Sequence, residues 1–151
     1  MIKDLEAAIG YQFKNITLLQ NALTHSSYAN ERWHNSLLSN ERLEFLGDSI
    51  LGMVVAEHLY RNFPDRPEGE LTRMRADMVC ETSLAQVAAR LELGRHLMLG
   101  KGEERFGGRN RASILADAVE SVIAASFLDG GMEAARGIID RFVLCDVPVS
   151  K

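Results

Sequence analysis

Residues 40–52, NERLEFLGDSILG, decide the fold of this chain. The stretch has the apolar content of a core helix, yet it carries acids at Glu41, Glu44 and Asp48. On a helix these positions are spaced i, i+3 and i+7, so the carboxylates form one stripe about 10 Å long. Like charges at this spacing repel, and removal of water increases the cost of the charged forms. The pattern predicts that a favourable interaction offsets the cost of placing these charges together.

A second pair of acids lies in the predicted helix over residues 114–128. This segment is almost wholly apolar, which is typical of a helix buried on most sides, and Asp117 and Glu120 lie inside it at positions i and i+3. A buried charge without a partner is costly, so the two acidic helices are expected to face each other. The resulting cage would contain only oxygen ligands, which suit Mg²⁺ or Mn²⁺ and suit zinc poorly. The expected metal ligands are Glu44, Asp48, Asp117 and Glu120.

Structural salt bridges are the alternative explanation of these acids. Nearby arginines such as Arg42, Arg73 or Arg75 could each pair with one carboxylate. The helix over residues 114–128, however, contains no lysine or arginine within its own turns. Salt bridges therefore explain a single acid more readily than both pairs, and we favour the metal cage.

The rest of the chain is predicted to be all-α and to form one domain over residues 1–145, followed by a linker or tail over 146–151. Of the 151 residues 46% are hydrophobic, enough for one compact core. Polar loops are expected over residues 26–40 and 100–111. The expected helices cover about 2–10, 17–25, 40–62, 68–80, 83–94, 113–131 and 132–144, with Ser39 or Asn40, Thr82 or Ser83, and Ser113 as N-caps and with Gly130 and Gly131 ending the sixth helix.

Composition narrows the function classes. The chain has no run of 18 apolar residues and has acids near its N-terminus, so a cytoplasmic protein without membrane association is expected. Its net charge of −4 has the wrong sign for a protein that holds nucleic acid by charge alone, although cations bound by the acids would make the working surface more positive. Cys80 and Cys145 stand alone and are expected to be buried thiols rather than zinc ligands or a disulfide.

Residues 40–52 resemble the signature of the ribonuclease III endonuclease domain. The segments ALTHSS, EGELTRMRA, LELGRHLMLGKGEE and SILADAVESVIAASFLD resemble the same family in order and spacing, over about residues 5–145. The resemblance implies a dimeric helical bundle that cleaves double-stranded RNA with Mg²⁺, for which Mn²⁺ can substitute, and without an organic cofactor. It implies products with 5′-phosphate and 3′-hydroxyl ends and short 3′ overhangs, and a role in the processing of rRNA and other RNAs.

The resemblance also assigns roles to individual residues. Position by position, the family's metal-binding and catalytic acids fall on Glu44, Asp48, Asp117 and Glu120, which are the acids already singled out. Asp48 and Glu120 are expected to organise the attacking water. Glu41 and Glu68 match further acids of the family and are expected in the outer part of the site or at the dimer contact.

RNA contacts are expected from basic and hydroxyl side chains outside the acidic helices. The segment over residues 101–111 has a local charge of +2 among several glycines, and a second candidate segment lies over residues 72–75. Duplex RNA is read mostly through phosphates and 2′-hydroxyls, so a few such groups suffice. The possible contacts are Thr72, Arg73, Arg75, Lys101, Arg105, Arg109 and Arg111; a solvated surface loop is the alternative for the segment over 101–111.

The helical wheel of the signature favours a homodimer. Leu43, Leu46, Ile50 and Val54 mark the core face, whereas Phe45 and Gly52 lie on the other side and leave apolar surface beside the acids. A partner subunit would cover this surface, and the resemblance places Phe45 at a two-fold interface. Cover by another helix of the same chain is the alternative.

Two other functions remain open. An all-helical nucleoside-triphosphate pyrophosphohydrolase also builds its metal site from acids at i and i+3 on facing helices. A catalytically silent relative would serve as an RNA-binding or ribosome-associated scaffold, but such domains usually lose carboxylates, whereas this chain keeps all four. His25 in ALTHSS is expected to be structural, at a helix end. Bacterial relatives commonly carry a C-terminal RNA-binding domain, so this sequence resembles either a truncated or a naturally short protein.

Overall fold

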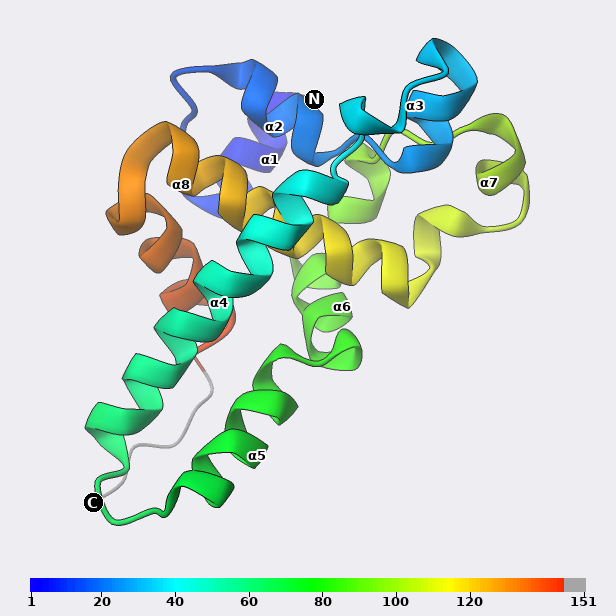
Figure 1. The fold of residues 1–151 in the computed structure, drawn as a ribbon. Helices are drawn as coiled ribbons and strands as arrows, with labels where there is room; N and C mark the ends of the chain where they lie inside the picture. The colour runs from blue at the N-terminus through cyan, green and yellow to red at the C-terminus, as the bar shows by residue number, and fades with distance from the viewer. Residues whose placement is uncertain (146–151) are drawn as a thin grey trace.

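The computed structural model describes residues 1–145, which form α-helices and short 3₁₀ helices (Figure 1). No β-strand forms in this part of the chain, where an isolated bridge joins Thr24 to Met98. The all-α class is therefore confirmed, and the predicted tail over 146–151 lies outside the described residues. The elements are α1 (Ile2–Ile9), α2 (Ile16–Ala22), α3 (Ser26–Trp33), η1 (Ser36–Leu38), α4 (Glu41–Asn62), α5 (Glu68–Val79), α6 (Glu81–Arg90), η2 (Leu93–His96), α7 (Lys101–Arg105), η3 (Gly108–Asn110) and α8 (Ala112–Phe142).

The fold is organised around the crossing of α4 and α8 (Figure 1). α8 is buried along residues 118–126, where every residue lies in the interior, as its apolar sequence predicts. Leu51, Val54 and Leu59 of α4 enter the same core. α6 and α2 pack on further sides of α8. The acidic helices thus lie at the centre of the domain rather than on its edge.

Gly47 sets the distance between the two central helices. A Cβ atom added at Gly47 would lie 1.8 Å from the carbonyl oxygen of Glu120. Such a distance is impossible for a real side chain, so this approach requires glycine. The same contact brings the part of α4 that carries Glu44 and Asp48 against the part of α8 that carries Asp117 and Glu120.

α8 is bent rather than ended at its double glycine. Gly131 has φ 76° and ψ −174°, a conformation that favours glycine, and a second helical segment continues directly beyond it. The sequence predicts an end at Gly130 and Gly131, so the break is in the right place, but the two segments stay joined. Just before the bend, the Tyr11 hydroxyl donates to the Asp129 carboxylate at 2.6 Å, and this bond fastens the chain after α1 to α8.

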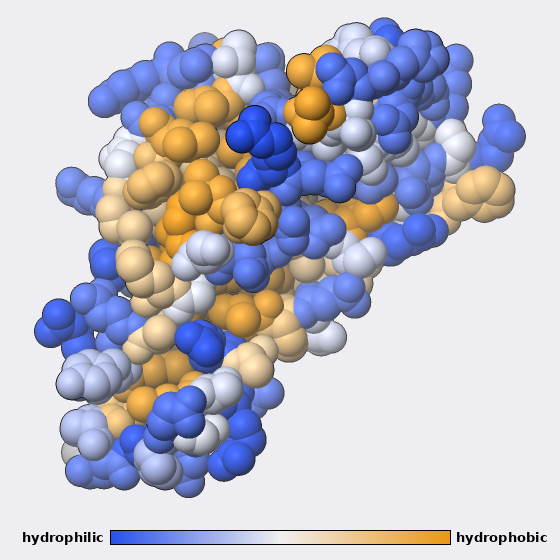
Figure 2. All heavy atoms as spheres, in the orientation of Figure 1, coloured by the Kyte–Doolittle hydropathy of each residue, from blue (hydrophilic) through white to orange (hydrophobic). Residues whose placement is uncertain are grey.

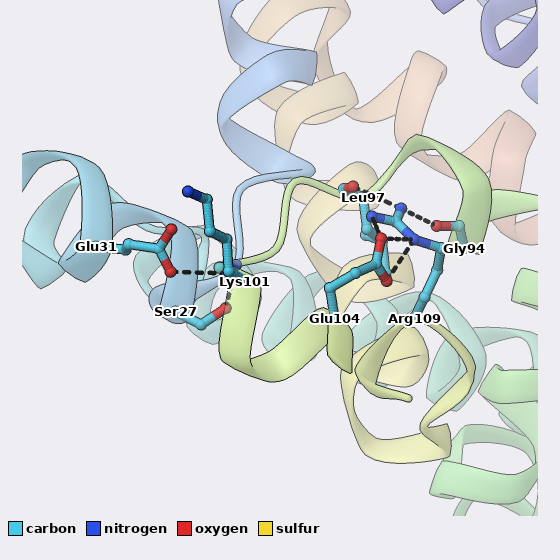
Figure 3. Close-up of polar contacts among 8 residues, drawn as sticks. Ser27, Glu31, Gly94, Leu97, Lys101, Glu104 and Arg109 are labelled. Atoms are coloured by element: carbon cyan, nitrogen blue, oxygen red, sulfur yellow. Dashed lines mark hydrogen bonds and ion pairs between the residues drawn. The ribbon is translucent and has the colours of Figure 1, made fainter. Parts of the chain in front are cut away.

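Two segments predicted as loops contain helices. Residues 26–40 form α3 and η1, and residues 100–111 form α7 and η3. Side chains of α3 cap α7: Ser27 Oγ and a carboxylate oxygen of Glu31 accept the backbone N–H groups at the start of α7 at 2.8 and 2.7 Å (Figure 3). Because the stabilising partner is distant in the sequence, the local pattern does not indicate either helix.

Predicted helix starts differ from the structure by one or two residues. α6 begins at Glu81 because Cys80 before it is extended, and Ser83 donates its hydroxyl to the Asp77 carbonyl instead of capping the helix. α8 begins at Ala112, so Ser113 lies inside the first turn rather than at the N-cap. At α4, Ser39 accepts the Glu41 N–H at 3.3 Å, whereas the Asn40 side chain makes no capping bond.

Two further expectations concern the cysteines and the membrane. Cys80 and Cys145 are free thiols, but both are exposed, so the expectation that they are buried is wrong. Within residues 1–145, none of the helices has the length and apolar character needed to cross a membrane.

An apolar stripe remains exposed along α4. Leu43, Ile50 and Val54 are buried as predicted, but Phe45 is 77% exposed, and no helix of the described chain covers it. Figure 2 shows hydrophobic surface gathered over α4. The exposed members of this α4 stripe are Phe45, Met53 and Tyr60. α5 beside it contains no buried residue, whereas α4 packs on α8 along its length, so α5 depends on fewer internal contacts than α4 (Figure 1).

Replacing Gly47 by alanine is expected to destabilise the protein by about 1–3 kcal/mol, because the added Cβ forces α4 and α8 apart. Gly102→Ala, in α7, is the matched control, since nothing lies within 4 Å of its added Cβ. That variant is expected to be neutral or to stabilise by up to about 1 kcal/mol. Chemical denaturation measures both effects, and a Gly47→Ala protein as stable as its parent would contradict this account of the helix crossing.

Candidate functional site

The structure brings the predicted acids together at the crossing of α4 and α8. Carboxylate oxygens of Glu44, Asp117 and Glu120 lie within 4.8 Å of one another. Asp48, one turn after Glu44, is not among these three, although its charge and hydrogen bonding act on the Glu120 carboxyl group. Glu120 is buried, Glu44 is half-buried, and Asp48 and Asp117 are exposed. These four residues, the acidic cluster, therefore form a site that is open on one side.

No cation of the described chain neutralises the acidic cluster. None of the ion pairs among residues 1–145 involves any of its four acids. Arg42, Arg73 and Arg75, the alternative partners, form no ion pair in this part of the chain either. The salt-bridge explanation is therefore wrong for this structure.

Burial raises the pKa values of two acids of the cluster. Burial raises the pKa of Glu120 to about 9, assisted by its hydrogen bond to Asp48 and by the charges of Asp48, Glu44 and Asp117. Loss of hydration raises the pKa of Asp117 to about 6, and the charge of Glu44 acts in the same direction. Without a bound cation, the acidic cluster therefore holds a proton at neutral pH.

The donor set fits a hard divalent cation. Glu44, Asp117 and Glu120 offer only carboxylate oxygens, at separations that one cation can span, and no sulfur or imidazole ligand lies among them. A divalent cation here would offset the repulsion and displace the proton on Glu120. The acidic cluster is thus able to bind a metal ion.

Two residues near the acidic cluster were not assigned to it from the sequence. Glu81, the first residue of α6, contributes to the raised pKa of Asp117 through its charge. His25 accepts the Ser27 N–H at Nδ1, which leaves Nε2 as the protonated nitrogen of the neutral ring, and it caps α3. Burial lowers the pKa of His25, so its ring is uncharged at neutral pH even though the charges of Glu103 and Asp117 oppose this shift.

Glu41 and Glu68 lie in different parts of the molecule. Glu41 begins α4 beside the acidic cluster, and its charge acts on Asp117. Glu68 begins α5 and accepts the Thr72 hydroxyl at 3.2 Å in a groove that is also lined by Tyr60. Tyr60 lies 16 residues after Glu44, about 24 Å along α4. Within one chain, Glu68 is therefore remote from the acidic cluster, and its expected contribution to the site or the dimer remains a prediction.

The basic residues of the 101–111 segment divide into two groups. The Arg109 guanidinium binds the Glu104 carboxylate at 2.7 Å and also donates to two backbone carbonyls of the segment over 94–97 (Figure 3). Arg111 pairs with Glu103 at 3.4 Å. Lys101 and Arg105 are exposed and form no ion pair among the described residues. Only the second group has its charge free for a ligand.

The predicted RNA contacts on α5 are more accessible to solvent than Arg109 is. Arg73 is exposed, whereas Arg75 and Thr72 line the groove between α4 and α5, where Thr72 donates to Glu68. This groove has a volume of about 580 Å³ and contains Met53 and Tyr60 of the α4 stripe. The arrangement joins Arg75 and Thr72 to apolar surface rather than to the acidic cluster.

Comparison with known proteins agrees with the geometry. A family model described as ribonuclease-III-like matches residues 15–147. Ribonuclease 3 of Caldanaerobacter subterraneus is 57% identical over 139 residues, which are 92% of this chain and 60% of that protein. Ribonuclease 3 of Desulforamulus reducens is 55% identical over 135 residues, covering 89% of this chain and 55% of that protein. The chain thus spans less than two thirds of the length of these relatives.

A solved structure provides the same comparison at the level of the fold. The nuclease domain of ribonuclease III from Campylobacter jejuni, described as structurally flexible in a region involved in dimer formation, has a TM-score of 0.90 and 40% identity. The match covers 99% of this chain and 100% of that one. Signature, fold and relatives agree, and the chain belongs to the ribonuclease-III-like family.

Proposed function

We propose that this chain is the nuclease domain of a metal-dependent endoribonuclease that hydrolyses phosphodiester bonds of double-stranded RNA. The acidic cluster carries the proposal, because its uncompensated carboxylates suit a divalent cation and lie on an open face. Membership of the ribonuclease-III-like family supports the same reaction class. We place the activity in the cytoplasm, in the processing of rRNA and other RNAs.

The residues of the acidic cluster have different roles in the proposed reaction. Bound Mg²⁺, for which Mn²⁺ could substitute, would supply an activated water and neutralise charge on the attacking and leaving oxygens. Glu44, Asp117 and Glu120 would hold the cation, with Asp48 beside Glu120 as the fourth proposed ligand. Asp48 and Glu120 would position the attacking water in line with the 3′ oxygen as leaving group. The products carry 5′-phosphate and 3′-hydroxyl ends, and no organic cofactor is needed.

The α4 stripe supports a homodimer. Phe45 and Tyr60 are more than three quarters exposed at 77% and 76%, an unusual placement for large aromatic side chains on one helix face. A second copy would cover this surface, and in a symmetric pair each copy uses the same patch. The two acidic clusters would then act on opposite strands of one duplex and leave short 3′ overhangs.

The alternative functions have less support. A nucleoside-triphosphate pyrophosphohydrolase would not share the signature at residues 40–52, and an inactive scaffold would not need Glu44, Asp117 and Glu120 gathered at one point. Incubation with Mg²⁺ and either duplex RNA or nucleoside triphosphates separates the three functions. Cleavage of duplex RNA alone supports the proposal.

Mg²⁺ is expected to stabilise the fold more at about pH 9 than at about pH 6. Glu120 keeps its proton to about pH 9 in the folded chain and loses it near pH 4.5 when unfolded, so metal-free stability falls as pH rises through this window. Metal binding needs ionised carboxylates and removes this loss. Thermal melts with Mg²⁺ and with EDTA measure the difference. Glu133→Gln, which changes an exposed acid of α8 outside the acidic cluster, is the control and should keep the Mg²⁺ effect of the parent. An equal effect at both pH values would contradict the assignment.

Glu120→Gln is expected to reduce cleavage of duplex RNA on the order of 100-fold or more, because a ligand charge is lost while the shape is kept. RNA binding should remain within a few-fold of the parent. A dimer of one parent and one Glu120→Gln subunit should nick a single strand. Double-strand cuts by the isolated mixed dimer, or a monomeric parent by sedimentation at micromolar concentration, would argue against two sites in one homodimer.

Replacing Lys101 and Arg105 together by alanine is expected to weaken RNA binding and to reduce the slope of log affinity against log salt by roughly one for each phosphate that is no longer neutralised. Arg109→Ala is the matched control, because its charge is already bound by Glu104 and by backbone carbonyls. The control should lower thermal stability and leave the salt slope unchanged. Binding titrations over a range of salt, in a Glu120→Gln background, measure the slopes, and equal slopes for both variants would remove Lys101 and Arg105 from the RNA surface.

A further inference from the structure

Asn40 is a buried polar residue at the junction of three segments. It is 6% exposed and directly precedes α4, where an asparagine would ordinarily cap the helix. Its side chain makes no such bond, and Ser39 accepts the Glu41 N–H in its place. The Asn40 amide therefore serves another purpose.

That amide ties the start of α4 to the end of α2. Asn40 Nδ2 donates to the carbonyl of Ala22 at 2.9 Å, and the Asn40 backbone N–H donates to the carbonyl of Thr24 at 2.8 Å. The Ala22 and Thr24 side chains are buried as well. The two bonds together fix the position and the direction in which α4 begins.

The Asn40 carbonyl reaches the acidic cluster on both helices. It accepts the backbone N–H of Glu44 at 2.8 Å, in the first turn of α4, and the hydroxyl of Ser121 at 3.2 Å, on α8. Ser121 is fully buried and directly follows Glu120, and its single hydroxyl hydrogen is shared between the Asn40 carbonyl and the carbonyl of Asp117 at 2.9 Å. The Asn40 carbonyl thus links the first turn of α4, which carries Glu44, to the turn of α8 that carries Asp117 and Glu120.

We propose that Asn40 is a positioning residue for the metal site, acting through Glu44. Its buried amide holds the first turn of α4 on α2, so that the Asn40 carbonyl presents Glu44 to Asp117 and Glu120 across the helix crossing. Gly47 permits the two helices to approach, and Asn40 fixes how far α4 is turned and shifted along α8. The inference rests on the proposed metal-dependent function.

Mn²⁺ binding by the protein alone, measured by calorimetry without RNA, tests this role. Asn40→Ala is expected to weaken Mn²⁺ binding by about 10-fold or more, the range found when groups that orient metal ligands are removed. RNA binding should be unchanged, and cleavage should recover at raised metal concentration. Ser121→Ala, which removes the bond from α8 to the same carbonyl, is expected to weaken binding by about fivefold.

Two control variants separate positioning from general loosening. Asn21→Ala removes a side-chain amide that holds the carbonyls of Leu38 and Ser39, immediately before Asn40, and should leave Mn²⁺ affinity within about twofold of the parent. Ile139→Val, in the core beyond the bend of α8, should lower the melting temperature without weakening metal binding.

The outcomes distinguish this inference from the proposed function. Parent-like Mn²⁺ affinity in Asn40→Ala, or equal weakening in Asn21→Ala, would overturn the role of Asn40 while leaving the metal site in place. A parent protein that binds no Mn²⁺ would overturn the proposed function and this inference with it. If Asn40→Ala does not fold, Ser121→Ala decides, and unchanged affinity in that variant would reject the role.

Discussion

The close approach of α4 and α8 at Gly47 is the constraint on which the rest of the structure depends. With Gly47 against the Glu120 carbonyl, carboxylates from two helices come within reach of one ion, and none of the described cations comes with them. The energetic consequence is visible in Glu120, whose pKa rises to about 9. Core packing elsewhere on α8, which is uninterrupted from residue 118 to 126, must offset this local cost.

The acidic cluster could be predicted from the sequence because its signal is local and periodic. Acids at helical spacing within apolar runs, as at Glu44 and Glu120, are costly wherever they are buried, so their presence alone indicates compensation. The resemblance then placed each acid in a family pattern. Neither source gave the distance between the helices, because the contact of Gly47 with a carbonyl 73 residues later is a property of the packed chain.

The failures of sequence reasoning have a common physical cause. The sequence predicts loops where α3 and α7 form, because both segments are polar and the side chains that cap α7 come from α3. Arg109 and Lys101 are likewise both basic residues of one segment. Arg109 is bound by Glu104 and by backbone carbonyls, whereas Lys101 forms no ion pair among the described residues. The capping group, the ion-pair partner and the exposure of these residues depend on tertiary contacts, so a short window of the sequence does not reveal them.

The capping of α7 by α3 also bears on the order in which the chain can fold during synthesis. Ser27 and Glu31 precede the backbone groups that they bind by 73 and 70 residues. At about 5–20 residues per second, a ribosome needs roughly 4–14 s to cover that distance. During this interval α3 lacks its tertiary partner, and α4 exposes an apolar face and an acidic stripe whose counterpart on α8 does not yet exist. The domain therefore completes its core late, when α8 emerges, and until then the core face of the signature helix has no partner to pack on.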